Sequence, residues 1–169
     1  MKKNLILIGM MAVGKSTVGK IVAQKQGLKF IDTDRNIEKK SSMKISKIFK
    51  ERGERFFRKE EEKEVKKSLQ INGCVIALGG GAFINKKIRE IILENGISFW
   101  LDTNLKTLIK RSKWNDNRPL IKQGNNHMVI NQLYAKRKNI YKLANYKILC
   151  DGLTKDTIAK KVIELYEKH

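Results

Sequence analysis

The sequence has few of the residues that build disulfide-linked or metal-stabilised scaffolds. It contains two cysteines, Cys74 and Cys150, which lie far apart and belong to no Cys-x-x-Cys pair. Neither a disulfide framework nor a zinc site is therefore indicated. We expect both cysteines to be small buried residues, because each lies at one end of an apolar run.

Long hydrophobic runs are also missing, since no stretch approaches the roughly 20 consecutive apolar residues that a transmembrane helix needs. The first residues, two lysines followed by an apolar run, resemble a secretory signal, but they continue into Gly-Lys-Ser-Thr instead of a small-x-small cleavage site. We therefore expect no export signal and no membrane partner, and a cytoplasmic protein.

Acidic residues are scarce: 17 of them face 37 lysines and arginines, which gives a net charge of +20. Such an excess can indicate nucleic-acid binding. The lysines are scattered through every segment, however, and aromatic residues do not alternate with them as in a single-strand binder. We interpret the charge as a solvated surface that attracts anionic substrates, and expect no specific nucleic acid as partner. A basic ATP- or nucleic-acid-binding module is the non-enzyme alternative.

Proline occurs once, at Pro119, within a polar segment of little periodicity that runs from 110 to 126. An irregular stretch of this length inside a compact domain is usually a lid or is disordered. The rest of the 169-residue chain is long enough for one domain with a sizeable core.

Short apolar runs alternate with longer segments of helical spacing. This alternation predicts parallel strands joined by helices, and the lack of in/out alternation within the runs predicts helices on both faces of the sheet. A charge run at 58–67 fits the solvated face of a helix, with pairs such as Glu62 to Lys66. The apolar runs lie at 5–8, 28–31, 75–78, 97–101 and 146–150.

The first apolar run leads into Gly9-x-x-x-x-Gly14-Lys15-Ser16, the pattern of a phosphate-binding loop between a strand and a helix. Glycines let backbone amides approach phosphate oxygens, and the start of a helix adds positive potential. Lys15 supplies a full charge for the β- and γ-phosphates, and the Ser16 hydroxyl can ligate Mg²⁺. We expect the nucleotide to be held by Met11, Ala12, Val13, Gly14, Lys15, Ser16 and Thr17.

Many proteins with a phosphate-binding loop have an Asp that supports the Mg²⁺ ion at the end of a later apolar strand. Here no carboxylate follows the apolar run at 75–78. The nearest acidic residues are Asp32 and Asp34, two positions apart, which project the same way if the chain there is extended. One could bind metal-coordinated water while the other reaches an acceptor hydroxyl. A strand-end Asx turn without chemistry is the alternative for either residue alone.

A second group of residues suggests an acceptor pocket. Helical spacing places Arg58 and Glu61 on one face, where the carboxylate could orient the guanidinium, and Arg137 lies one turn before Tyr141. Either arginine alone could be a surface charge. The triple glycine at 79–81 changes this balance, because backbone without side chains can approach a ligand at the carboxyl end of a parallel strand. We expect a two-substrate active site at that edge.

Six motifs in this order resemble the shikimate kinase family over nearly the whole chain. The motifs are GMMAVGKST, DTD at 32–34, GERFFR at 53–58, LGGG at 78–81, NRPL at 117–120 and RKNIY at 137–141.

The resemblance implies an α/β fold, the three-layer P-loop kinase fold, with a central five-stranded parallel sheet flanked by helices. It implies one kinase domain over 1–169, with a substrate-binding insertion at about 33–60 and a mobile lid at about 111–125, acting as a monomer. The implied reaction moves the γ-phosphate of ATP to the 3-hydroxyl of shikimate, on the way to chorismate and aromatic amino acids. Another P-loop small-molecule kinase, such as a gluconate or nucleoside-monophosphate kinase, is the alternative.

On the nucleotide side, the resemblance implies catalytic roles for Lys15 and Arg118. Arg118 would move in with the lid to neutralise the transferring phosphoryl group, and Arg111 would lie near the nucleotide. Ser16 would ligate Mg²⁺, which Asp32 would support through water.

On the acceptor side, the resemblance implies that Asp34 binds the ring hydroxyls of shikimate and helps to deprotonate the attacking one. Arg58 and Arg137 would hold the shikimate carboxylate, and Glu61 would brace Arg58. The backbone of Gly79, Gly80 and Gly81 would contact the hydroxylated ring.

Overall fold

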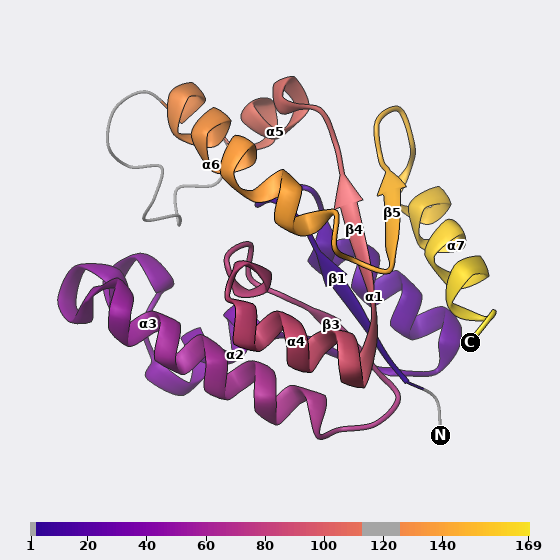
Figure 1. Cartoon of the computed structure of the whole chain (residues 1–169), viewed down its shortest axis with the longest axis horizontal. Helices are drawn as coiled ribbons and strands as arrows, with labels where there is room; N and C mark the ends of the chain where they lie inside the picture. The colour runs from indigo at the N-terminus through magenta and orange to yellow at the C-terminus, as the bar shows by residue number, and fades with distance from the viewer. Residues whose placement is uncertain (1–2, 113–125) are drawn as a thin grey trace.

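A computed structural model describes residues 3–112 and 126–169. Five strands form one sheet in the order β2-β3-β1-β4-β5, and all neighbouring strands are parallel (Figure 1). The five predicted runs are confirmed to within two residues at their ends. The strands are β1 Asn4–Ile8, β2 Lys29–Asp32, β3 Cys74–Ala77, β4 Gly96–Asp102 and β5 Tyr146–Leu149.

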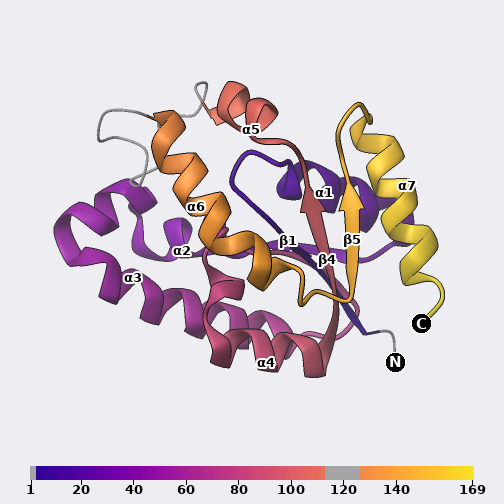
Figure 2. The same ribbon diagram turned by 45° about the horizontal axis from the view of Figure 1, so that its top comes forward.

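Helices cover both faces of the sheet, as predicted (Figure 2). The connection from β1 to β2 runs across the sheet in the opposite direction to the connection from β3 to β4, so right-handed crossovers put their helices on opposite faces. Helix α1 packs against α7 on one face, and α4 packs against α3 on the other. The helices are α1 Lys15–Gln26, α2 Thr33–Ser41, α3 Ile45–Leu69, α4 Lys86–Asn95, α5 Leu105–Ser112, α6 Asn126–Tyr141 and α7 Lys155–Tyr166, with a 3₁₀ turn, η1, at Ala82–Ile84.

The core lies in the middle of the sheet. Every residue of β1, β3 and β4 is buried, which explains why their sequences do not alternate between apolar and polar residues. Trp100 and Phe99 on β4 are among the largest fully buried side chains. The edge strands β2 and β5 are partly exposed, and Leu149 on β5 is 63% exposed. Both cysteines are free and buried, as expected.

Helix α3 carries the predicted charge run, and the Glu62–Lys66 ion pair is present at 2.6 Å. The helix is kinked at Gly53, whose φ of 79° is in the left-handed region that favours glycine. A small second core of Ile37, Ile48 and Phe57 joins α2 to both halves of α3. Throughout the part of the chain that the structure describes, no helix is long and apolar enough to cross a membrane.

The topology places a crevice at the carboxyl edge of the sheet. Strands β1 and β3 are neighbours, but the chain leaves them toward opposite faces. Open α/β sheets bind their ligands at such a switch point. The loop at 9–14 follows β1 and the glycines at 79–81 follow β3, so both sequence motifs meet there.

Candidate active site

The crevice holds a cavity of about 500 Å³. Its walls come from the loop after β1, the β2–α2 junction, α3, the loop after β3 and α6, and they include most of the predicted site residues. Those that line the cavity are Met11, Ala12, Gly14, Lys15, Ser16, Thr17, Asp32, Asp34, Arg58, Glu61, Gly79, Gly80, Gly81 and Arg137.

Among the described residues, two that were predicted for the site, Val13 and Arg111, do not line the cavity. Val13 is buried beneath the phosphate-binding loop, and its carbonyl accepts hydrogen bonds from Lys155 Nζ at 2.9 Å and from an Arg111 guanidinium nitrogen at 3.5 Å. Arg111 therefore contacts the loop but is not among the residues that line the cavity. Arg118 and most of the predicted lid lie outside the described residues.

The phosphate-binding loop has the geometry that its sequence predicts. Helix α1 begins at Lys15, and its N-cap, Gly14, has a φ of 103° and offers no side-chain cap. The first amides of α1 are thus open to an anion, which the helix dipole also favours. The Lys15 ammonium crosses the loop and donates to the carbonyls of Gly9 at 2.8 Å and Met10 at 2.9 Å.

The DTD motif differs from the expected extended chain. Helix α2 begins at Thr33, because Asp32 Oδ1 caps it by accepting the Arg35 amide at 3.2 Å. Asp34 therefore lies in the first turn of a helix and not on a strand, so the alternation argument for the two aspartates is wrong. Both still line the cavity, since the turn of α2 carries Asp34 past the end of β3. Asp32 therefore makes a local capping turn, as the alternative interpretation proposed, and also lines the cavity.

Ser16 and Asp32 form a pair of oxygen ligands next to the loop. The Ser16 hydroxyl donates to Asp32 Oδ2 at 2.6 Å. Hydroxyl and carboxylate oxygens suit Mg²⁺, which usually keeps several waters and takes few protein ligands. Within residues 3–112 and 126–169 there is no group of three His, Cys, Asp or Glu side chains that could hold a metal ion. The hydroxyl of Ser16 and the carboxylate of Asp32 are of the type that could hold such an ion or its waters.

Arg58 is fixed by two carboxylates. Its guanidinium donates to Glu61 at 2.8 Å and to Glu54 at 3.1 Å. Burial lowers the pKa of Arg58, but the two carboxylates outweigh it and the pKa is raised. Burial raises the pKa of Glu61, which is 1% exposed, and Arg58 opposes that effect. The pair keeps a guanidinium in one orientation at the cavity wall.

The glycines after β3 let site side chains lie directly against the backbone. A Cβ atom at Gly79 would collide with the Asp34 carboxylate, and one at Gly81 would collide with the Arg58 guanidinium. At Gly80 the nearest atom would be an Arg137 guanidinium nitrogen, at 3.3 Å. The sequence suggested close approach of the backbone to a ligand. In the structure, the chain's own charged groups already use that space.

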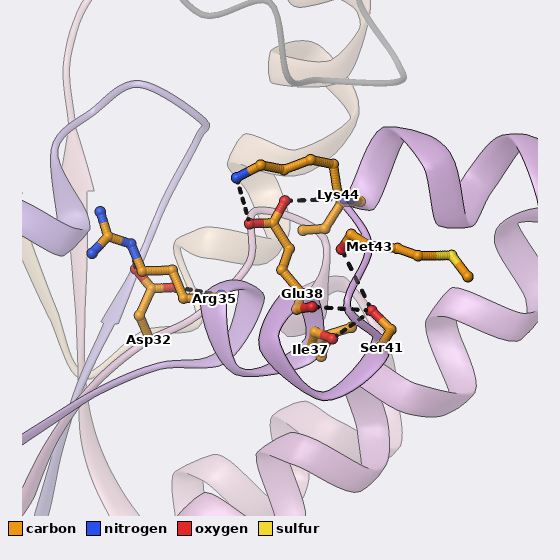
Figure 3. A network of polar contacts seen from close by, with 8 residues as sticks. Asp32, Arg35, Ile37, Glu38, Ser41, Met43 and Lys44 are labelled. Carbon is orange, nitrogen blue, oxygen red and sulfur yellow. Dashed lines mark hydrogen bonds and ion pairs between the residues drawn. The ribbon is translucent and has the colours of Figure 1, made fainter.

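Sequence reasoning missed the corner between α2 and α3. Glu38 lines the cavity and accepts the Ile45 amide at 3.0 Å and the Lys44 ammonium at 3.4 Å (Figure 3). It thereby caps α3, whose own N-cap residue, Lys44, provides no side-chain cap. A cap that comes from another helix leaves no local sequence signal. Ile45, Phe49 and Phe57 give this wall of the cavity its apolar part.

Comparisons with known proteins identify the family of this chain. Residues 11–167 match the family model described as shikimate kinase. A shikimate kinase of Sulfurihydrogenibium sp. (strain YO3AOP1) is 42% identical over 161 residues, which cover 95% of this chain and 96% of that protein. The structure of a shikimate kinase from Acinetobacter baumannii in complex with shikimate aligns with a TM-score of 0.95 and 31% identity, over 98% of this chain and 93% of the other.

A gluconokinase from Sinorhizobium meliloti 1021 aligns with a TM-score of 0.61 and 11% identity. At that identity the likeness shows a shared fold alone. The comparisons therefore confirm the resemblance seen in the motifs and give no support to a gluconate kinase.

Proposed function

The chain belongs to the shikimate kinase family, and we propose from the geometry of its cavity how it transfers the γ-phosphoryl group of ATP to the 3-hydroxyl of shikimate. One observation carries the proposal. Arg58, Arg137 and Asp34 gather against the glycines after β3, across one cavity from the phosphate-binding loop. Two guanidinium groups suit a carboxylate, and a carboxylate side chain suits ring hydroxyls.

On the nucleotide side, the loop at 11–17 binds the phosphates of ATP through its amides and Lys15. The Lys15 ammonium exchanges its two carbonyl partners for β- and γ-phosphate oxygens. Arg111 stays close to the nucleotide through its contact with the Val13 carbonyl of the loop. Arg118, on the proposed lid at about 111–125, would neutralise charge on the transferring group.

On the acceptor side, Arg58 and Arg137 hold the shikimate carboxylate in a charge-assisted clamp. Glu61 keeps Arg58 oriented through the 2.8 Å ion pair. The backbone at 79–81 supports the hydroxylated ring, and the apolar wall of the α2–α3 segment covers its other side. This segment corresponds to the proposed insertion at about 33–60 of a single kinase domain.

The chemistry needs positioning, charge stabilisation and one proton acceptor. Asp34 lies beside Gly79, where it can accept a hydrogen bond from the 3-hydroxyl and take its proton as the oxygen bonds to phosphorus. The bond from the γ-phosphorus to the β,γ-bridging oxygen breaks, and ADP leaves. Ser16 would ligate Mg²⁺ and Asp32 would hold one of its waters. When bound, the ion neutralises phosphate charge.

We extend the proposal to a monomer that works in the cytoplasm. Light scattering of the purified protein with and without both substrates tests the monomer. A stable dimer would contradict it.

A panel of acceptors tests the proposed reaction. We expect ATP-dependent ADP release with shikimate, and at least about a hundredfold less with gluconate or nucleoside monophosphates. Gluconate carries its carboxylate on a flexible open chain and not on a ring, and nucleoside monophosphates carry no carboxylate for the two arginines. The measurement is coupled ADP detection, with mass spectrometry of the product. Comparable turnover with gluconate would contradict the assignment of the pocket.

The glycine loop provides a second test. Gly81→Ala should raise the KM of shikimate by about tenfold or more, because the new methyl group displaces the Arg58 guanidinium from its carboxylate contacts. Gly80→Ala is the matched comparison, since its nearest neighbour is 3.3 Å away and can move slightly. We expect a smaller rise for Gly80→Ala. Equal effects, or a rise in the KM of ATP alone, would contradict this account.

A further inference from the structure

Helix α6 carries a tyrosine, Tyr141, that has no role in the proposed arginine clamp or in the phosphate-binding loop. Tyr141 is 1% exposed, and its hydroxyl donates to the Gly80 carbonyl at 2.5 Å. The two residues are 61 positions apart, so the bond ties α6 to the loop after β3. Helix α6 lies near the loop after β3 and contacts η1, which follows that loop (Figures 1 and 2).

Tyr141 lies next to two residues of the proposed acceptor site, Arg137 and Gly80. Arg137, one turn earlier on α6, faces Gly80 on the cavity wall, and both it and Tyr141 are buried. Burial raises the pKa of Tyr141 to about 12, and Arg137 lowers it in opposition, so the guanidinium and the hydroxyl are close neighbours. The hydroxyl thus keeps its proton at neutral pH and can act as a donor throughout the working range.

From this geometry we infer that Tyr141 is a positioning residue for shikimate. Its hydroxyl fixes the Gly80 peptide and, through α6, sets the distance between that peptide and the Arg137 guanidinium. The inference rests on the proposed acceptor pocket and adds a residue that does not line the cavity. Tyr141 acts through Gly80 and Arg137 and does not take part in the chemistry itself.

Tyr141→Phe tests the inference with little disturbance of packing. The phenylalanine ring keeps the contact with Trp100, whose ring centroid lies 5.9 Å away, and loses only the hydroxyl. The buried Gly80 carbonyl then has no donor from α6. We expect the KM of shikimate to rise roughly tenfold, with kcat changed less than about threefold and the Kd of ATP unchanged.

Tyr134→Phe is the matched control. Tyr134 lies on the same helix and donates to Asp102 at 3.1 Å, away from the cavity, and Asp102 keeps its 3.0 Å ion pair with Lys147. This variant should show the shikimate KM of the unmodified protein. Thermal unfolding of both variants separates stability from positioning, because a purely structural role would lower the melting temperature without a selective change in KM.

The outcomes are distinct. An unchanged shikimate KM in Tyr141→Phe, or an equal change in Tyr134→Phe, overturns the inference. Either result in an enzyme that phosphorylates shikimate leaves the proposed function intact. Failure of the unmodified protein to phosphorylate shikimate would instead overturn the proposed function.

Discussion

Asp34→Asn should lower kcat by about a hundredfold to ten-thousandfold, because an amide cannot accept the proton of the attacking hydroxyl. Asparagine retains the size of the side chain, so it still fits beside Gly79. The KM of shikimate should change much less than kcat, since the amide oxygen can still accept a hydrogen bond from the ring. Steady-state kinetics with coupled ADP detection measures both parameters.

Asp156→Asn is the matched control for this change. Asp156 is also an acidic residue in the first turn of a helix, α7, but its side chain is 73% exposed and pairs with Lys25 at the surface. Loss of a first-turn charge alone should leave kcat within about twofold of the unmodified protein. If Asp34→Asn retained similar turnover in a folded protein, Asp34 would have no part in the chemistry.

Arg58→Ala should raise the KM of shikimate by about tenfold to a hundredfold or more, because a hydrogen bond to a charged group contributes about 1.5 to 3 kcal/mol. ATP should bind as before, since Arg58 lies on α3, across the cavity from the phosphate-binding loop. Titration with a non-hydrolysable ATP analogue measures the nucleotide affinity of the variant. A parallel loss of affinity for both substrates would contradict the clamp.

The control for this variant is Arg55→Ala, an exposed arginine on the same helix. It separates the local contact from a general effect of removing one positive charge from a chain that carries +20. Arg58→Ala also leaves Glu61 buried with only Arg137 to oppose its raised pKa, since Arg58 contributes the larger opposing effect in the unmodified protein. Since a raised carboxyl pKa favours the folded state at low pH, this variant should lose stability as the pH rises toward neutral.

The parts of the site that the sequence predicts are local motifs, whose residues lie close together along the chain. The phosphate-binding loop, the triple glycine and the Arg58–Glu61 pair each occupy a few consecutive or one-turn positions, so spacing alone describes them. The central strands β1, β3 and β4 were predictable for a similar reason, because burial on both faces leaves continuous apolar runs. The family resemblance then implied that these motifs lie together in one active site.

The parts that escaped prediction depend on contacts between separate elements of the fold. The Glu38 cap on α3 comes from another helix, and the hydroxyl of Tyr141 reaches a carbonyl 61 residues away. The two aspartates of the DTD motif show a different reason. Their assumed strand geometry failed because Asp32 is itself a good helix N-cap, and that local preference starts α2 at Thr33.

The ammonium of Lys155 on the carbonyl of Val13 has a further consequence. Helix α7 packs along α1, and its first residue contacts the loop that we propose binds the triphosphate. In the proposed function, α1 and α7 thus support the nucleotide loop together, while the residues proposed for shikimate lie between these two helices along the chain. A defect in the packing of α7, for example at Ala159 or Val162, would therefore impair the use of ATP before that of the acceptor.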